Sequence, residues 1–390
     1  MSGEPLMFGP DYGFGIYIHW PYCAKICPYC DFNVYAAKGQ TNTLLIQAIC
    51  DDIRIHRPRM PKHGALDSIY LGGGTPSLLR PTQISDILRA VDESFGLAPD
   101  AEITLEANPN DIMQADLRGL KAAGVNRLSI GVQSIRGGAL AFLGRDHDEI
   151  TAVTSVQRAL KLFPNVSIDL IYARPGQSLH EWQMELEDVL KLGVPHMSLY
   201  ELTIAEPTAF GKAVERGQII PMEDDDQADL YELTQALLGA AGLPAYEVSN
   251  HAISPDYQSK HNLTYWNGGD WIGVGPGAHG RVSVGNQRYA SKAEDKPASY
   301  IENVQALKSG WVDAGKLYPL DIARELLAMG LRPSTGIERH RVEAVSGRPL
   351  PQDKIDVFVE EGWVVTDGHR IALTAKGRLL ADALTAELSA

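Results

Sequence analysis

Short apolar runs alternate with longer amphipathic segments between about residues 14 and 202. The runs are apolar on both faces, and the longer segments repeat apolar residues with a helical period. This pattern is typical of buried parallel strands that are each followed by a helix. We predict strands at residues 15–19, 68–71, 102–107, 127–132, 166–171 and 197–202, and helices near residues 41–56, 81–95, 113–123, 148–162 and 179–192.

Six strand–helix repeats indicate an α/β fold with a parallel sheet and helices outside it. The repeats lack a Rossmann fingerprint, so we favour a partial TIM-like (β/α)6 barrel. We assign this barrel to residues 14–250, after a short N-terminal tail at residues 1–13. Sites in such barrels gather at the C-terminal ends of the strands.

The periodicity is lost between residues 251 and 317, which are rich in Gly, Asn, His and aromatic residues. We interpret this segment as loop-built and as a plausible binding surface. It contains the motif His261-Asn262-x-x-Tyr265-Trp266, which places one imidazole beside two aromatic rings that are suited to line a flat ligand.

The pattern changes again from about residue 318. Helical segments at residues 321–330 and 353–361 precede a hairpin at residues 363–371 with an Asp-Gly turn, and a last helix covers residues 375–388. This order predicts a winged-helix-like α+β module at residues 318–390. Residues 336–390 hold 7 Lys or Arg against 9 Asp or Glu, so a packing or docking role is favoured over DNA binding.

The overall charge supports the same conclusion for the whole chain. A net charge of −14 over 390 residues argues against a nucleic-acid partner, because phosphate contacts need an excess of Lys and Arg. No apolar run approaches the roughly 18 residues of a membrane helix. The first residues lack the basic and apolar regions of a secretory signal, and the chain has only four cysteines. We therefore expect a cytoplasmic protein without a transmembrane segment.

Three of the four cysteines lie within eight residues, as Cys23, Cys27 and Cys30, directly after the first predicted strand. Thiolates are the usual ligands of iron–sulfur clusters, and a set of three leaves one iron without a protein ligand. The alternatives are a zinc site, which would need a fourth ligand such as His19 or Asp31, and a disulfide, which would leave one cysteine over. Cys50 lies in an apolar helix and is expected to be a buried, inert thiol.

Polar or glycine-rich sequences also lie in or directly after the C-terminal part of the other predicted strands. They are Gly72-Gly73-Gly74-Thr75-Pro76, Glu106, Gln133, Asp169 and Tyr200-Glu201. Each alone is compatible with a satisfied core group. Five strands that end in this way at one edge favour a single shared pocket.

The C-x3-C-x2-C spacing, with an aromatic residue before the last cysteine, resembles the radical S-adenosylmethionine (SAM) superfamily. Together with the glycine stretch, Arg145 and the His-Asn-x-x-Tyr-Trp motif, it resembles the haem chaperone branch of the oxygen-independent coproporphyrinogen III oxidase-like family. The resemblance implies a [4Fe-4S] cluster on Cys23, Cys27 and Cys30, and a cluster-bound SAM contacted by Tyr17, Gly73 and Glu106. Positions that hold a second SAM in the dehydrogenase relatives are Tyr29, Gly74, Thr75, Gln133, Arg145 and Asp169.

Two departures separate this chain from the dehydrogenases. Their motif continues to a fourth cysteine, where Phe32 stands here, and they carry a long N-terminal extension, whereas about a dozen residues precede the first strand here. The resemblance thus implies a protein that binds haem and delivers it to acceptors such as respiratory cytochromes at the inner membrane face. The alternative is a SAM-dependent coproporphyrinogen III dehydrogenase of porphyrin biosynthesis, so the sequence leaves open whether the protein is an enzyme. It also favours neither a monomer nor a homodimer.

The resemblance makes His261 the candidate axial ligand of haem, since histidine commonly holds haem iron. Asn262 would orient the imidazole through its second nitrogen. His251 and His279 are nearby alternatives.

Overall fold

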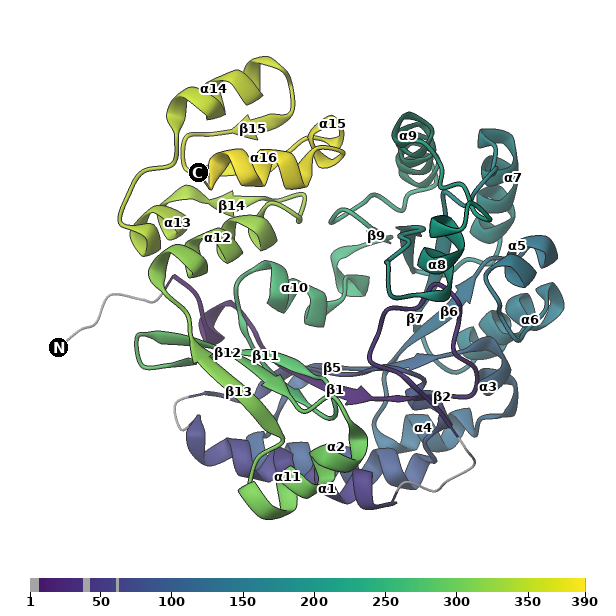
Figure 1. The fold of residues 1–390 in the computed structure, drawn as a ribbon, viewed down its shortest axis with the longest axis vertical. Helices are drawn as coiled ribbons and strands as arrows, with labels where there is room; N and C mark the ends of the chain where they lie inside the picture. The colour runs from purple at the N-terminus through teal and green to yellow at the C-terminus, as the bar shows by residue number, and fades with distance from the viewer. Residues whose placement is uncertain (1–6, 38–42, 61–62, 390) are drawn as a thin grey trace.

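A computed structural model describes residues 7–37, 43–60 and 63–389 of the chain. The six predicted strands are present and pair in parallel, in the order expected (Figure 1). They are β1 (Phe14–Trp20), β4 (Leu66–Gly73), β5 (Leu97–Ala107), β6 (Arg127–Gln133), β7 (Asn165–Tyr172) and β8 (His196–Glu201). Most of their residues are buried on both faces, because helices cover one face and further segments cover the other.

The sheet is larger than predicted and is open. Five more strands extend it to eleven, with β9 (Asn250–Ala252) at one edge and β13 (Trp311–Lys316) at the other. Beside β1 lie β10 (Asp270–Val274), which is parallel to it, and then β11 (His279–Val284) and β12 (Gln287–Ala293), which are antiparallel. A minor two-stranded sheet joins β2 (Tyr22–Cys23) to β3 (Tyr35–Ala36).

The interpretation of residues 251–317 as loop-built was therefore wrong. This segment also contains α10 (Lys260–Trp266) and α11 (Pro297–Leu307). Its glycines reflect close packing of strands: a Cβ on Gly273 would overlap the carbonyl of His279 on the neighbouring strand. The alternation that identifies a strand is missing from two of these strands, because β10 is buried along its whole length and β13 is exposed along most of its length.

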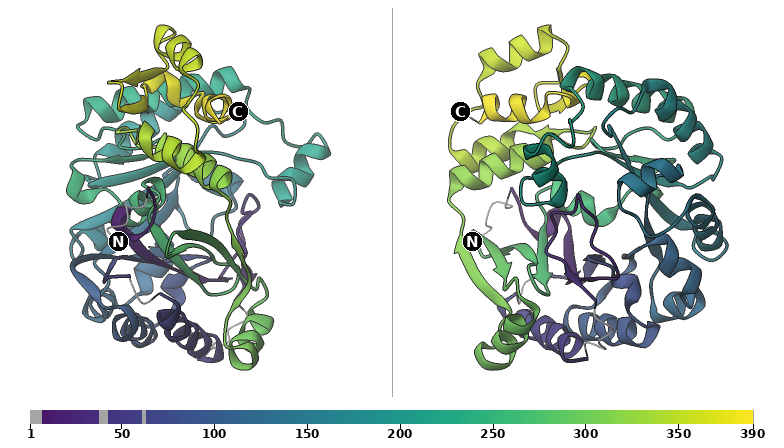
Figure 2. Two further views of the ribbon diagram at one scale, coloured as in Figure 1. Left: turned by 90° about the vertical axis from the view of Figure 1, so that its left-hand side faces the viewer. Right: turned by 45° about the vertical axis from the view of Figure 1, so that its right-hand side comes forward.

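The outer helices are close to those predicted and surround the sheet (Figure 2). They are α1 (Thr43–His56), α2 (Pro81–Phe95), α3 (Pro109–Gln114), α4 (Leu117–Ala123), α6 (Glu149–Leu160) and α7 (Leu179–Leu190). The single helix predicted near residues 113–123 is thus two short helices. Residues 41 and 42 of the first predicted helix lie outside the described residues. Three further helices follow strands: α5 (Gly137–Phe142), α8 (Ala209–Glu215) and α9 (Asp224–Ala240).

The C-terminal module has its own apolar core and lies over the open side of the sheet (Figures 1 and 2). Its hairpin is β15 (Val364–Thr366) and β16 (Arg370–Leu373), which pairs with β14 (Ile337–Glu338) in a three-stranded antiparallel sheet. The helices are α12 (Pro319–Gly330), α13 (Arg339–Ser346), α14 (Gln352–Glu360), α15 (Ala375–Arg378) and α16 (Ala381–Leu388). The last predicted helix is therefore divided in two.

The end of the predicted N-terminal tail is packed against this module. Phe8 belongs to the apolar core of the module, and Arg341 donates hydrogen bonds to the carbonyl of Met7 over 2.9 and 2.7 Å. The Arg341 guanidinium also lies over the ring of Tyr12. Residues 1–6 of the predicted tail lie outside the described residues. In the described part of the chain, no helix combines the length and apolarity that crossing a membrane requires.

Candidate functional site

The cysteine loop begins at the C-terminal end of β1. Cys23 is buried and Cys27 and Cys30 are partly buried, and all three are free thiols. Burial raises the pKa of the Cys23 thiol, and raises that of Cys30 to about 11. Thiolates at these positions therefore need a nearby positive charge or a bound metal to stabilise them.

One such charge comes from Arg145. Its Nη1 lies 3.2 Å from Cys27 Sγ, and its Nη2 donates to Asn108 Oδ1 over 2.6 Å and to the Gly131 carbonyl over 2.9 Å. Asn108 in turn donates to Thr75 Oγ1 over 3.1 Å. The end of β5, the glycine segment and the cysteine loop are thus joined through one guanidinium.

The three thiols are a donor set that suits an iron–sulfur cluster, because thiolates are the usual ligands of such clusters. They line the same cavity, with an arginine donating to one sulfur.

The glycine segment turns sharply at the end of β4. Gly73 has a φ of +105°, and a Cβ there would overlap the ring of His19. The amides of Gly74 and Thr75 donate to the carbonyls of Trp20 and Tyr22 over 2.7 and 2.8 Å, which ties the segment to the cysteine loop. The Gly73 amide instead points at the end of β5.

Glu106 receives that amide. Its Oε2 accepts from the Gly73 amide over 3.0 Å, and its Oε1 accepts from the Tyr70 hydroxyl over 2.8 Å. Burial raises the pKa of Glu106 to about 7, and the nearby carboxyl of Asp169 acts in the same direction. A buried carboxyl with such a pKa is suited to pair with a ligand cation such as an amino group.

Gln133 ends β6, and Asp169 lies within the next strand, β7. Asp169 Oδ1 accepts from the Ser129 hydroxyl over 3.1 Å, and burial raises the pKa of its carboxyl to about 6. Gln133 has a φ of +64°, a strained backbone conformation for a residue with a Cβ. The strand therefore breaks where its side chain reaches the cavity.

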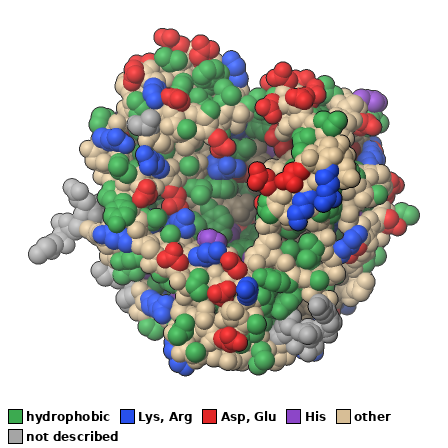
Figure 3. All heavy atoms as spheres, viewed as in Figure 1, with side chains coloured by type: hydrophobic (Ala, Val, Ile, Leu, Met, Phe, Trp, Pro, Cys, Tyr) green, Lys and Arg blue, Asp and Glu red, His purple; other side chains and the backbone are tan. Residues whose placement is uncertain are grey.

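These residues border one cavity of about 910 Å³, at the upper end of the range for small-molecule sites. Figure 3 shows the hollow between the C-terminal module and the side of the molecule that carries α8 and α9. The predicted residues that line it are Cys23, Cys27, Tyr29, Cys30, Gly73, Gly74, Thr75, Glu106, Gln133, Arg145 and Asp169. The structure thus brings most of the predicted site together.

Tyr17 does not line this cavity. Its side chain is partly buried, and its hydroxyl lies 3.0 Å from His19 Nδ1. Its ring packs against those of Tyr70 and His261. Tyr17 thus packs against Tyr70, which does line the cavity.

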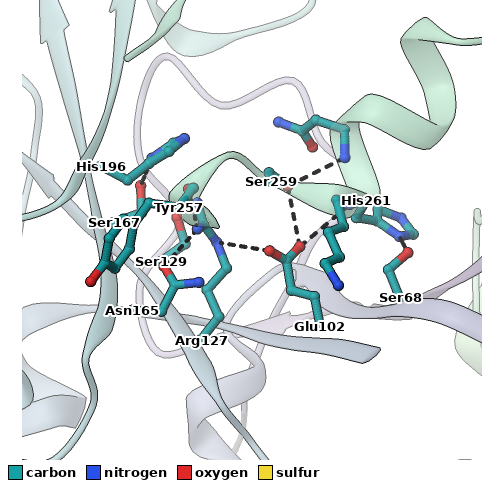
Figure 4. A network of polar contacts seen from close by, with 12 residues as sticks. Ser68, Glu102, Arg127, Ser129, Asn165, Ser167, His196, Tyr257, Ser259 and His261 are labelled. Atoms are coloured by element: carbon teal, nitrogen blue, oxygen red, sulfur yellow. Dashed lines mark hydrogen bonds and ion pairs between the residues drawn. The ribbon is translucent and has the colours of Figure 1, made fainter. Parts of the chain in front are cut away.

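His261 also lies away from the cavity, which disagrees with its prediction as a haem ligand. It is 1% exposed, and its Nδ1 lies 2.8 Å from Ser68 Oγ (Figure 4). Its Nε2 lies 2.6 Å from the Tyr265 hydroxyl. Its ring stacks on that of Tyr70, and burial lowers its pKa to about 3. Both ring nitrogens are occupied, so binding to iron would break a hydrogen bond. Asn262, predicted to orient this imidazole, lines the cavity instead.

The two alternative histidines differ from each other. His251 is 1% exposed and neither of its ring nitrogens has a hydrogen-bond partner among the described residues. Burial lowers its pKa to about 3, and the Arg378 charge acts in the same direction. His279 is exposed on β11. Neither is among the residues that line the cavity.

Several residues of the cavity were not predicted. Asn108 follows the last residue of β5, two positions after Glu106, so its position after a strand was an available signal. The buried network that reaches the floor of the cavity (Figure 4) has no such signal: Arg127 donates to Asn165 Oδ1 over 2.7 Å and lies 3.9 Å from Glu102 Oε2. Arg332 and Arg378 reach the cavity from the C-terminal module, a contact between distant parts of the chain.

Comparison with known proteins finds a matching family for the sheet domain and another for the C-terminal module. It matches the family model of the radical SAM superfamily over residues 17–189 and that of the HemN C-terminal domain over residues 317–380. Radical S-adenosyl methionine domain-containing protein 1, mitochondrial, of Danio rerio is 39% identical over 85% of this chain and 75% of that protein. Heme chaperone HemW of Mycobacterium tuberculosis is 34% identical over 97% of this chain and 95% of that protein.

The fold has a solved counterpart. The structure of coproporphyrinogen III oxidase (HemN) from Escherichia coli, described as a radical SAM enzyme, matches with a TM-score of 0.81. The match covers 97% of this chain and 90% of that one at 22% sequence identity, so it establishes the shared fold alone.

Proposed function

Because the chain belongs to the HemW family of the radical SAM superfamily, we propose that it is a haem chaperone. In this role it binds haem and delivers it to haem-protein acceptors such as respiratory enzymes. The observation that carries the proposal is the nearly full-length similarity to proteins named as heme chaperones. The cavity supports it, because it offers a haem-sized ligand a site bordered by both the sheet and the C-terminal module.

We assign the [4Fe-4S] cluster to Cys23, Cys27 and Cys30, whose thiols share the cavity with the Arg145 guanidinium. When bound, the cluster supplies an iron without a protein ligand, at which SAM is held through its amino and carboxylate groups. Glu106 is suited to orient the amino group, since its carboxylate is buried and already fixed by two hydrogen bonds. Arg145 holds Asn108 by a hydrogen bond, and Asn108 in turn holds Thr75.

The stoichiometry of SAM is a further part of the proposal. Tyr29, Gly74, Thr75, Gln133, Arg145 and Asp169, which match a second SAM position, line the same cavity as the cysteines. A second SAM would therefore occupy space that we assign to haem. We propose one SAM per chain in the haem-bound protein, and SAM titration followed by equilibrium dialysis measures this number.

The second candidate function is coproporphyrinogen III dehydrogenase. The shared fold is compatible with it. Phe32, at the position of the dehydrogenases' fourth cysteine, is 64% exposed at the cavity, and this favours the chaperone function. We expect anaerobically reconstituted protein to bind haem stoichiometrically, as followed by absorbance. It should not convert coproporphyrinogen III to protoporphyrinogen in the presence of SAM and a reductant. Turnover in that assay would favour the dehydrogenase.

The site of action belongs to the same proposal. We infer a cytoplasmic protein that meets acceptors such as respiratory cytochromes at the inner face of the membrane. Co-sedimentation with membranes that contain or lack haem-free acceptors tests this contact. Light scattering of the reconstituted protein, with and without haem, distinguishes a monomer from a homodimer.

A further inference from the structure

We propose that Arg332 and Arg378 form a carboxylate-binding subsite through which the C-terminal module takes the two propionate groups of haem. This inference rests on the proposed function and adds the residues that recognise the acidic edge of the porphyrin. Both arginines line the cavity and both come from the module, whereas the cluster cysteines line it from the sheet.

Arg332 follows α12 and is held over an aromatic ring. Its guanidinium carbon lies 4.7 Å from the centre of the Trp266 ring, a cation–π contact that fixes the plane of the group. Its Nε lies 3.9 Å from Glu247 Oε2, beyond hydrogen-bond distance. That Nε is buried without a hydrogen-bond partner among the described residues, although the side chain as a whole is 32% exposed. The group is thus oriented but not satisfied.

Arg378 ends α15 and lies next to α9 and β9. It is beside Tyr231 and His251. Burial raises the pKa of Tyr231 and lowers that of His251, and the Arg378 charge opposes the first shift and adds to the second. Its Nε is also buried without a hydrogen-bond partner in the described residues. Buried guanidinium nitrogens without partners are costly, so two of them at one cavity favour a ligand that supplies acceptors.

Of the described carboxylates near these arginines, only Glu247 is paired with one of them, because its buried Oε2 lies 3.9 Å from Arg332 Nε without a hydrogen bond. Glu247 Oε1 accepts from the Ser249 amide over 3.0 Å and also from the Asn250 side chain. Glu201 accepts from the Tyr172 hydroxyl over 3.1 Å. Asp382, on α16, is exposed at the rim. Glu247 therefore balances part of the Arg332 charge, but neither Nε atom has a hydrogen-bond acceptor among the described residues.

The chemistry of the ligand matches this arrangement. A guanidinium presents a planar fork of donors that fits a carboxylate with two hydrogen bonds. Haem carries two propionates on one edge of an otherwise apolar macrocycle, so a pair of arginines on one wall is suited to that edge. Ile26, Phe32 and Val34 line the same cavity and offer apolar surface to the ring.

The test compares haem with haem dimethyl ester, in which both propionates are blocked. Each is titrated into full-length, cluster-reconstituted wild type and into the double variant Arg332→Gln/Arg378→Gln. The matched control is Arg324→Gln/Arg348→Gln. It replaces two exposed arginines of the same module and therefore changes the net charge by the same amount as the test variant. We expect wild type and control to bind haem about 10- to 100-fold more tightly than the ester. The double variant should bind both equally.

Thermal unfolding of each variant checks that it is folded. If the Gln variant is unstable, Arg332→Lys/Arg378→Lys replaces it, because lysine keeps the charges but lacks the planar donors of a guanidinium. We expect this variant to prefer haem over the ester, by a smaller factor than wild type does. An equal affinity of wild type for haem and its ester would overturn the subsite while leaving the haem chaperone function intact. So would an unchanged preference in a folded double variant. Wild type that binds neither porphyrin would contradict the proposed function itself.

Discussion

The backbone amide of Gly73 donates a 3.0 Å hydrogen bond to the side chain of Glu106, which joins the ends of β4 and β5 at the cavity. The same carboxyl accepts from Tyr70 and is buried, with a pKa raised to about 7. A ligand cation that binds there would meet a carboxylate whose charge is otherwise poorly stabilised. Two predictions follow from this pairing, one on stability and one on SAM binding.

The stability of the cofactor-free protein should depend on Glu106. A carboxyl whose folded pKa exceeds its unfolded value of about 4.5 contributes stability below that value, and this stability is lost as the pH rises to about 7. The loss amounts to roughly 3 kcal/mol. Denaturant unfolding of wild type and Glu106→Gln at pH 4, 6 and 8 should show the variant gaining by about this amount from low to high pH. A constant difference between the two proteins would contradict the raised pKa.

SAM affinity should follow the ionisation of the same group. We expect SAM to bind wild type more tightly at pH 8 than at pH 6, because the carboxylate form of Glu106 pairs with the SAM amino group. Glu106→Gln should weaken binding about 10- to 100-fold and lose this pH dependence. Iron and sulfide content should stay unchanged in the variant. If SAM left the cluster spectrum of wild type unaltered, the superfamily's cofactor would not apply to this chain.

Replacing a predicted cluster ligand and replacing the fourth cysteine should have different effects on the cluster. Cys50 is 5% exposed on α1, and its Sγ is directed at the Asp86 carbonyl over 3.8 Å, away from the cavity. Anaerobic reconstitution of Cys50→Ala should give the iron and sulfide content of wild type, whereas Cys30→Ala should lose the [4Fe-4S] absorbance. The reverse pattern would move the cluster.

His261 should behave as a structural residue. It is buried and both ring nitrogens are within hydrogen-bond distance of Ser68 and Tyr265. We expect His261→Ala to lower the free energy of unfolding by about 2–4 kcal/mol and to leave the haem absorbance spectrum of the folded protein unchanged. Parallel titrations of His251→Ala and His279→Ala show whether either of these supplies the iron ligand. Loss of the haem spectrum in folded His261→Ala alone would restore the axial-ligand assignment.

The sequence predicted the order of the central strands and the end at which the site lies. Strand β1 was expected at residues 15–19 and spans Phe14–Trp20. Gly73, Glu106 and Asp169 were expected at one edge and line one cavity, because parallel strands carry their C-terminal ends to the same side. These features depend on local periodicity, which a sequence records directly.

Features that depend on contacts between distant segments were missed. The Ser259 side chain caps α10 and so positions His261, but the packing of that helix against β4 is set by tertiary contacts. In the sequence, nothing distinguishes Arg332 and Arg378 from the other charged residues of the C-terminal module. Only the docking of the module over the sheet brings them to the cavity that holds Cys23.

The central claim is that this protein carries haem to an acceptor, and a direct transfer assay tests it most closely. Haem-loaded, cluster-reconstituted protein is mixed with a haem-free cytochrome, and the acceptor's absorbance spectrum is followed over time. A parallel reaction uses protein loaded with haem but lacking the cluster through Cys23→Ala. We predict that the reconstituted protein fills the acceptor faster than free haem at the same concentration, and that transfer falls without the cluster. Haem that stays on the reconstituted protein, or transfer no faster than from free haem, would contradict the account.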